Sequence, residues 1–154
     1  MYYTDYNSPI GKLRLVSDGS NLTALEIRQF SDNAIKRKDL PVFIKTAKWL
    51  DIYFSGNVPP KLDISLKPEG NEFRQEVWKM LRDIPYGETT TYGALAKRFN
   101  RKMSAQAIGG AVGHNPIAII IPCHRVIGAG GKLTGYAAGL SVKEKLLKLE
   151  GVIV

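Results

Sequence analysis

The sequence predicts an α/β protein of the α+β kind: a small β-rich N-terminal domain with one helix, then a helical C-terminal domain. Three observations predict this fold. Polar and apolar residues alternate over residues 11–27, apolar residues recur at helical spacing beyond residue 72, and the stretch between, "NVPPKLDISLKPEGN", carries three prolines. We therefore expect domains at residues 1–66 and 67–154, joined at this Pro-rich linker.

The N-terminal domain begins with strand signals. "GKLRLVS" and "LTALEI" both alternate, and "DGSN" between them is a turn sequence, so the three predict a β-hairpin. In "VFIKTAKWLDIYFSG" Phe43, Ala47, Leu50 and Phe54 recur at helical spacing, and Gly56 is expected to end this helix.

The C-terminal domain begins with a helical stripe of Phe73, Val77, Leu81 and Ile84, which Pro85 ends. "PYGETTTYGALAKRFN" follows and predicts a turn and a second helix, capped at its start by Thr91.

A third helix, "AQAIGGAVGHN", is expected after Ser104 as its cap. Two short helices across the tight "RKM" turn predict a helix-turn-helix, a pair that reads DNA in many proteins and also occurs in other helical cores. Small residues crowd the third helix although each interior glycine costs about 1 kcal/mol relative to alanine. Close approach of a neighbouring helix explains them, but the adjacent basic run "KRFNRK" favours a nucleic-acid groove.

Composition narrows the class of protein. The net charge is +8, and residues 72–154 carry 12 Lys and Arg against 6 Asp and Glu, so this part either binds a polyanion or is simply a basic, soluble surface. No apolar run is long enough to span a membrane, and "MYYTDYNSPIG" lacks signal-peptide features, so we expect a cytoplasmic protein. One cysteine cannot form an internal disulfide, and two histidines offer no cluster at metal-ligand spacing, so we expect any catalysis to be metal-free.

The single cysteine lies in "IIIPCHRV", at the end of an apolar run, "IAIII", that predicts a buried strand broken by Pro122. A lone cysteine is most often an inert buried side chain. His124, the next residue, makes Cys123 a candidate nucleophile, because an imidazole can take the thiol proton, here through a bridging water.

Two further features favour a reactive site. In "SVKEKLLKLEG", Ser141 and Glu144 have capping-box spacing and Gly151 is expected to end the helix. Glu150 then lies beside the buried face, where a carboxylate needs a partner such as His124, unless the helix end is frayed and exposed. The glycine-rich stretch "GAGGKLTGYAAGL" predicts a flexible loop, either a plain surface loop or a binding wall.

Taken together, these segments resemble the O6-alkylguanine-DNA alkyltransferases, also called methylated-DNA–protein-cysteine methyltransferases. The resemblance covers most of the chain: "SPIGKLRL", "FRQEVWKML", "IPYGETTTYGALA", the "NP" pair, "IPCHRV", and "GY" and "GL" leading to "KEKLLKLEG". The Pro-Cys-His-Arg-Val signature with a downstream glutamate is highly specific.

The resemblance implies direct repair of double-stranded DNA that contains O6-alkylguanine, and possibly O4-alkylthymine. The damaged base is flipped from the minor groove, and its alkyl group passes irreversibly to Cys123, once per molecule. His124 resembles the water-linked base and Glu150 the carboxylate that orients it. Tyr92 matches a proton donor to guanine N3, and Asn115 a hinge asparagine.

The same resemblance places three residues at the guanine and four at the DNA. The residues that correspond to the substrate pocket are Val126, which would act through its backbone carbonyl, Tyr136 and Ala137. Ala105, Gln106, Ala107 and Gly109 correspond to the DNA-binding face of the recognition helix. It also implies a protein that needs no cofactor and acts as a monomer.

Two positions depart from the family pattern. Gln106 stands where an arginine commonly fills the gap left by the flipped base, which predicts weaker DNA binding or less efficient flipping. Ala137 stands where many relatives have a serine near guanine O6, so leaving-group stabilisation would rest on backbone amides and Tyr92.

Other functions fit parts of the sequence. A cysteine, a histidine and an acid suffice for a thiol hydrolase, although the helix-turn-helix and the basic charge argue against it. A non-catalytic protein that only binds alkylated DNA would use the same fold, although relatives of that kind lack the cysteine.

Overall fold

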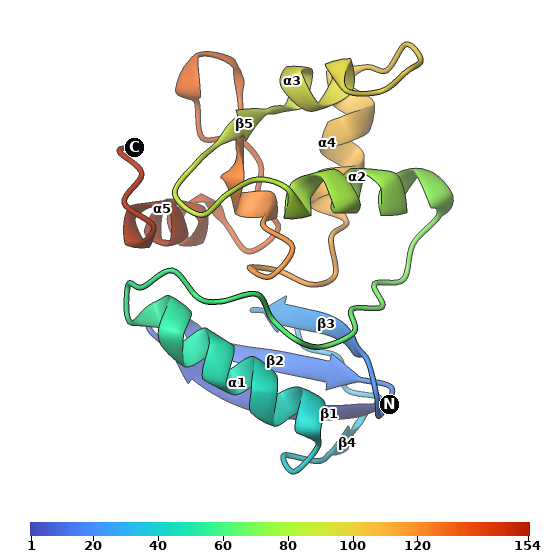
Figure 1. The fold of residues 1–154 in the computed structure, drawn as a ribbon, viewed down its shortest axis with the longest axis vertical. Helices are drawn as coiled ribbons and strands as arrows, with labels where there is room; N and C mark the ends of the chain where they lie inside the picture. Colours follow the sequence, from blue (N-terminus) through green and yellow to red (C-terminus); the bar gives the residue numbers. More distant parts are fainter. The chain divides into compact units, whose positions relative to one another are not determined.

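The computed structural model describes all residues, Met1–Val154, and divides into two compact units. The first unit comprises Met1–Glu69 and Pro116–Ala118, and the second comprises Gly70–Asn115 and Ile119–Val154. Figure 1 shows strands gathered in the first unit and most of the helices in the second. The predicted α/β fold class is therefore confirmed. The chain returns to the first unit once, at Pro116–Ala118, shortly before Cys123.

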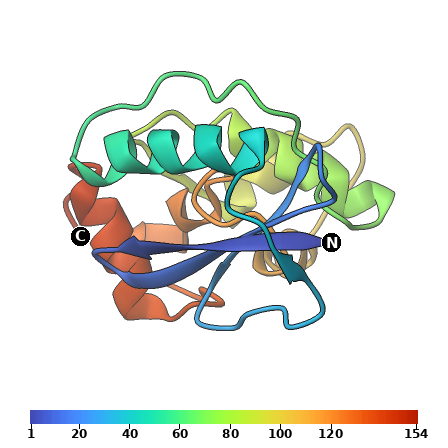
Figure 2. The same ribbon diagram turned by 90° about the horizontal axis from the view of Figure 1, so that it is seen from below.

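The first unit is a four-stranded sheet with one helix. The strands are β1 (Tyr2–Ser8), β2 (Gly11–Ser17), β3 (Leu22–Ile27) and β4 (Ile35–Lys36), in the order β3-β2-β1-β4. Neighbours are antiparallel except β4, which runs parallel to β1. Helix α1 (Pro41–Phe54) runs along the strands (Figure 2).

The predicted hairpin is present in β2 and β3. Alternation along β2 buries Leu13 and Leu15 completely, and the Asp18 carboxylate holds the turn by accepting hydrogen bonds from the backbone N–H groups of Ser20 and Asn21. Helix α1 buries one side, which includes Phe43, Leu50 and Tyr53, so burial of a shared apolar face stabilises the unit.

The strand expected from "IAIII" is absent, and that prediction is wrong. Ile117 makes one isolated bridge to Leu25 of β3, and the chain then turns, with Ile119 at φ 71. The Asn115 side-chain amide donates to the Ile121 carbonyl at 2.7 Å and closes the turn. A short buried apolar run fits a buried turn as well as a strand, and a bordering proline cannot donate to a ladder.

The second unit is mainly helical. Its elements are α2 (Glu72–Arg82), β5 (Thr90–Thr91), α3 (Tyr92–Lys97), α4 (Ala105–Gly113), η1 (Cys123–Arg125), β6 (Val126–Ile127), η2 (Ala129–Gly131) and α5 (Leu140–Leu149). The short strands β5 and β6 pair in parallel, which places the start of α3 beside the chain that follows Cys123.

Capping side chains fix the predicted helix-turn-helix. Thr91 accepts a hydrogen bond from the Ala94 N–H at the start of α3, and Ser104 accepts one from the Ala107 N–H at the start of α4. The indole of Trp78, in α2, donates to the Ala111 carbonyl of α4 at 2.9 Å. Each helix of the pair therefore begins at a capping residue, and α4 is joined to α2 by the Trp78 hydrogen bond.

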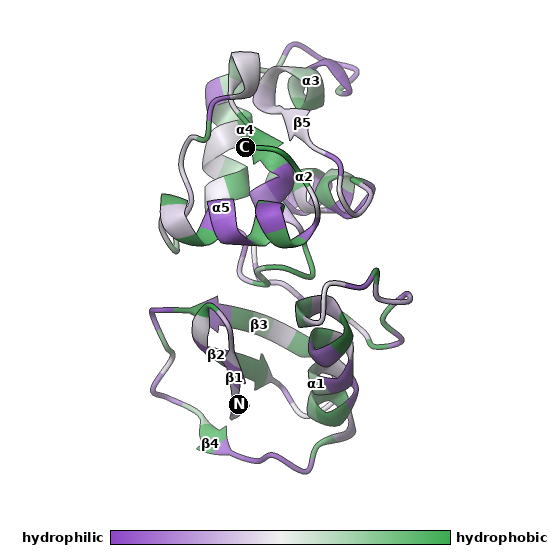
Figure 3. Cartoon of the chain, turned by 90° about the vertical axis from the view of Figure 1, so that its left-hand side faces the viewer, coloured by the Kyte–Doolittle hydropathy of each residue, from purple (hydrophilic) through white to green (hydrophobic).

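Helix α5 begins differently from the prediction. It follows Gly139, at φ 102, without a side-chain cap, so the expected capping box of Ser141 and Glu144 is wrong, and Glu144 instead pairs with Lys148 at 2.8 Å. Gly151 ends the helix as expected, at φ 85. Figure 3 shows both polar and apolar patches on α5, as expected of a helix with one face packed inward.

Candidate active site

Cys123 opens the 3₁₀ turn η1 and is buried, with 7% of its surface exposed. Burial raises the pKa of its thiol because the thiolate loses hydration. Hydrogen bonding by Asn115 and Tyr136 and the positive charge of Lys143 act in the opposite direction. The surroundings of the sulfur therefore contain three groups that favour the thiolate.

His124 and Glu150 form a buried pair. The imidazole Nε2 lies 2.5 Å from the Glu150 Oε2, both side chains are fully buried, and the His124 Nδ1 has no hydrogen-bond partner in the protein. Burial lowers the pKa of His124, and the neighbouring carboxylate only partly offsets this. A neutral His124 that donates through Nε2 keeps its lone pair on Nδ1.

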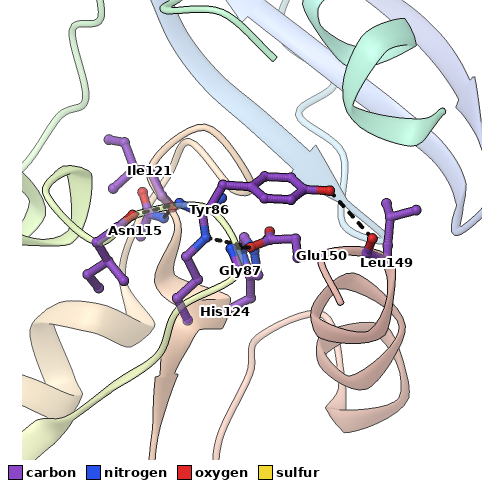
Figure 4. A network of polar contacts seen from close by, with 9 residues as sticks. Tyr86, Gly87, Asn115, Ile121, His124, Leu149 and Glu150 are labelled. Atoms are coloured by element: carbon purple, nitrogen blue, oxygen red, sulfur yellow. Dashed lines mark hydrogen bonds and ion pairs between the residues drawn. The ribbon is translucent and has the colours of Figure 1, made fainter. Parts of the chain in front are cut away.

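The second oxygen of Glu150 is also occupied. Oε1 accepts hydrogen bonds from the Arg125 Nε at 2.8 Å and from the Gly87 N–H at 3.1 Å, and Figure 4 shows the Gly87 contact beside His124. The Arg125 Nη1 donates to the Ile84 carbonyl at 2.7 Å. The carboxylate is thus held by hydrogen bonds on both oxygens.

Lys143 is a site residue that the sequence analysis missed. It is fully buried in α5, and its Nζ donates to the carbonyls of Val126, at 2.6 Å, and Thr134, at 2.7 Å. Burial lowers its pKa to about 8. Its spacing from Leu146 and Leu147 already placed it on the apolar face of the helix, and that signal could have identified it.

Tyr136 lies next to the cysteine. Its hydroxyl is buried and makes no hydrogen bond of ordinary geometry, and the Cys123 thiol is a polar neighbour. Burial first, and the Cys123 charge second, raise the pKa of Tyr136 well above its usual value, so the phenol stays protonated and able to donate.

The remaining predicted residues lie on the helix-turn-helix and on the glycine-rich loop. The Tyr92 hydroxyl donates to the Thr134 carbonyl at 3.4 Å, a long bond that joins α3 to this loop. Ala105 and Gln106 are exposed at the start of α4, Ala107 and Gly109 are half-buried, and Ala137 is exposed. The structure thus gathers Asn115, Cys123, His124, Val126, Tyr136 and Glu150 in one cluster and connects Tyr92 to the loop.

This arrangement of a buried thiol, a histidine paired with a carboxylate, and a cation can generate and hold a thiolate nucleophile. No three His, Cys, Asp or Glu side chains come together where they could hold a metal ion. No helix is both long enough and apolar enough to cross a membrane.

Two family models match the chain. The model described as "6-O-methylguanine DNA methyltransferase, DNA binding domain" matches residues 72–152, and the one described as "6-O-methylguanine DNA methyltransferase, ribonuclease-like domain" matches residues 1–68.

Individual proteins match over nearly the whole chain. A methylated-DNA–protein-cysteine methyltransferase of Haemophilus influenzae is 47% identical, over 99% of this chain and 87% of its own length. One of Methanosarcina acetivorans is 45% identical, over 98% of this chain and 99% of its own length. The crystal structure of Mycobacterium tuberculosis OGT in complex with DNA superposes with a TM-score of 0.88 at 46% identity, over 97% of this chain and 92% of that chain. The chain therefore belongs to the methylated-DNA–protein-cysteine methyltransferase family, the family that its motifs resemble.

Proposed function

We propose that this protein repairs O6-alkylguanine in duplex DNA by moving the alkyl group to Cys123 in a single, irreversible turnover. The observation that carries the proposal is the buried Cys123 beside a His124–Glu150 pair and the cation of Lys143, in the same unit as a helix-turn-helix. A structural cysteine would need none of these partners.

In the proposed reaction, the Cys123 proton passes to the His124 Nδ1. That atom makes no direct hydrogen bond to the sulfur, so a water molecule carries the proton between them. The thiolate attacks the alkyl carbon in line, the S–C bond forms, and the bond between carbon and O6 breaks. Guanine leaves as an anion and takes a proton at N3 from Tyr92. Tyr92 then regains a proton from solvent and His124 releases the thiol proton to solvent, so the numbers of protons taken up and released are equal.

The product explains why one molecule acts once. A thioether has no leaving group comparable to guanine, so no simple step regenerates Cys123. Asn115 and Tyr136 would stabilise the thiolate before the transfer, and the Val126 carbonyl, which keeps a second lone pair beside Lys143, would accept from the guanine amine.

DNA binding is assigned to α4 and its flanks. The exposed Ala105 and Gln106 and the half-buried Ala107 and Gly109 form a surface of mostly small side chains that can approach a minor groove closely. The excess of positive charge in residues 72–154 supplies contacts to phosphate. We further propose that the protein acts as a monomer, without a cofactor, on DNA in the cytoplasm.

Intact mass spectrometry after mixing with duplex DNA that contains one O6-methylguanine tests the proposal. We expect wild type to gain the mass of one methylene group, located on the Cys123 peptide and saturating at one per molecule, and Cys123→Ser to gain none. An unmodified wild type that still binds the lesion would make the protein a non-catalytic damage sensor, and turnover of a peptide or an ester would make it a thiol hydrolase.

A further inference from the structure

Arg125 is a buried cation that the reaction proposed above does not use. It is 8% exposed, and it follows His124 directly in the turn η1. Burying a guanidinium is costly unless its donors are satisfied. Here the Nε donates to the Glu150 Oε1 at 2.8 Å and the Nη1 to the Ile84 carbonyl at 2.7 Å, so the group is fixed at two points.

The partner of Arg125 is the same carboxylate that holds the histidine. Glu150 presents Oε2 to His124 and Oε1 to Arg125. A carboxylate that is charged accepts hydrogen bonds only, whereas a protonated one donates, so its charge decides which imidazole nitrogen carries the proton. A buried carboxylate would otherwise tend to take up a proton, and the adjacent guanidinium opposes this.

We propose that Arg125 is a positioning residue for alkyl transfer: it keeps Glu150 charged and oriented, so that His124 donates through Nε2 and presents Nδ1 as the base. This inference rests on the proposed function and extends its site by one residue. Arg125 touches neither the sulfur nor the guanine in this scheme and acts through Glu150 alone.

The charges around His124 support a second effect. Glu150 and Lys143 face it from α5, and Arg125 and Cys123 flank it within η1. The two cations lower the pKa of His124, whereas Glu150 raises it. As long as Glu150 stays charged, removing Arg125 therefore raises the pKa of His124. The acid limb of the reaction then moves to higher pH, because the base becomes protonated at a higher pH than in wild type.

Single-turnover kinetics with the O6-methylguanine duplex test this inference, with Arg125→Met and Arg125→Lys compared with wild type between about pH 5 and 9. The endpoint of methyl transfer counts the folded, active molecules, and the rate reports their chemistry. We expect Arg125→Met to react about tenfold to a hundredfold more slowly, at most the lower end of the ~10²–10⁴-fold that a general base contributes, because His124 itself remains, and with its acid limb at higher pH. Arg125→Lys should recover part of the rate because it retains the positive charge. The recovery should be incomplete because lysine lacks the planar guanidinium with its several N–H donors.

Arg14→Met is the matched control. Arg14 also pairs with a carboxylate through its Nε, to Asp5 at 2.8 Å, but it lies in the first unit. It should keep the wild-type rate and pH profile even if it lowers the melting temperature.

Imidazole ¹⁵N NMR gives a readout that does not depend on activity. With only two histidines the spectrum is simple, and His114→Gln assigns it. Wild-type His124 should be the neutral Nε2–H tautomer near pH 7, and Arg125→Met should lose that single state.

The two proposals can fail separately. A wild type that transfers no methyl group overturns the proposed function. If wild type is active and Arg125→Met has the same transfer rate, the same acid limb of the pH profile and the same His124 tautomer, the role of Arg125 alone is overturned. The same conclusion follows if the only defect of Arg125→Met is a smaller endpoint of methyl transfer.

Discussion

Lys143 is a full positive charge without a carboxylate partner, surrounded by carbonyl groups and close to the Cys123 thiol. A carbonyl carries only a partial charge, so hydrogen bonds to carbonyls offset only a small part of the desolvation free energy of a buried ammonium group. When the Cys123 thiolate forms, it supplies the missing negative charge, and each of the two groups favours the charged form of the other.

Lys143→Met therefore should slow alkylation of Cys123, by roughly tenfold for each unit by which the thiol pKa rises. Iodoacetamide, which needs no DNA, and the O6-methylguanine duplex should both report the loss. Lys145→Met, an exposed position on the same helix, should react like wild type. Equal rates for the two variants would mean that Lys143 serves only to hold the loop to β6.

At the scale of the element, α4 combines a defined start at Ser104 with a surface of small side chains. A Cβ placed on Gly109 would meet only the Tyr92 ring, at 3.8 Å, and one placed on Gly110 would meet nothing. The protein itself therefore requires neither glycine, and both positions have ordinary helical conformations.

Gly109→Ala should raise the free energy of unfolding by about 1 kcal/mol, because alanine favours the helix. The same methyl group should weaken DNA binding if this face of α4 enters the minor groove. Gly110→Ala should show the gain in stability without the loss of affinity. Thermal melts and fluorescence anisotropy with a labelled duplex measure both effects, and unchanged affinity for Gly109→Ala would place the DNA elsewhere.

Gln106 is exposed on α4, at the position where the family resemblance places an arginine that fills the gap left by a flipped base. Gln106→Arg should increase the transfer rate or the affinity for duplex DNA, because a guanidinium adds charge and stacking. Gln29→Arg, at an exposed position in the first unit, adds the same charge and should leave both unchanged. No difference between the two variants would show that the amide already suffices.

At the scale of the whole molecule, the net charge of +8 makes the encounter with DNA electrostatic. Most of the excess lies in residues 72–154, which contain both the helix-turn-helix and Cys123, so we expect the contacts to phosphate to come from the part of the chain that carries the chemistry. Reaction with a small substrate gains nothing from this charge.

Transfer from duplex DNA should consequently slow as salt rises, with log affinity falling by about 0.9 per phosphate contact for each unit of log salt. Transfer from free O6-methylguanine base should be nearly independent of salt. Measuring both rates on one preparation between about 50 and 200 mM salt separates binding from chemistry. A parallel loss in both would point to an effect of salt on the buried site itself.

The sequence alone was enough to predict the fold class, the hairpin, the capped helix-turn-helix and the family, and to single out Cys123 as the candidate nucleophile. These depend on local patterns, such as alternation, capping residues and a contiguous motif, that a chain displays without folding. The tertiary structure alone decided that "IAIII" is a buried turn, that Arg125 shares Glu150 with His124, and that Lys143 lies by the thiol. Contacts between residues some twenty positions apart depend on how η1 and α5 pack, and no local pattern records that packing.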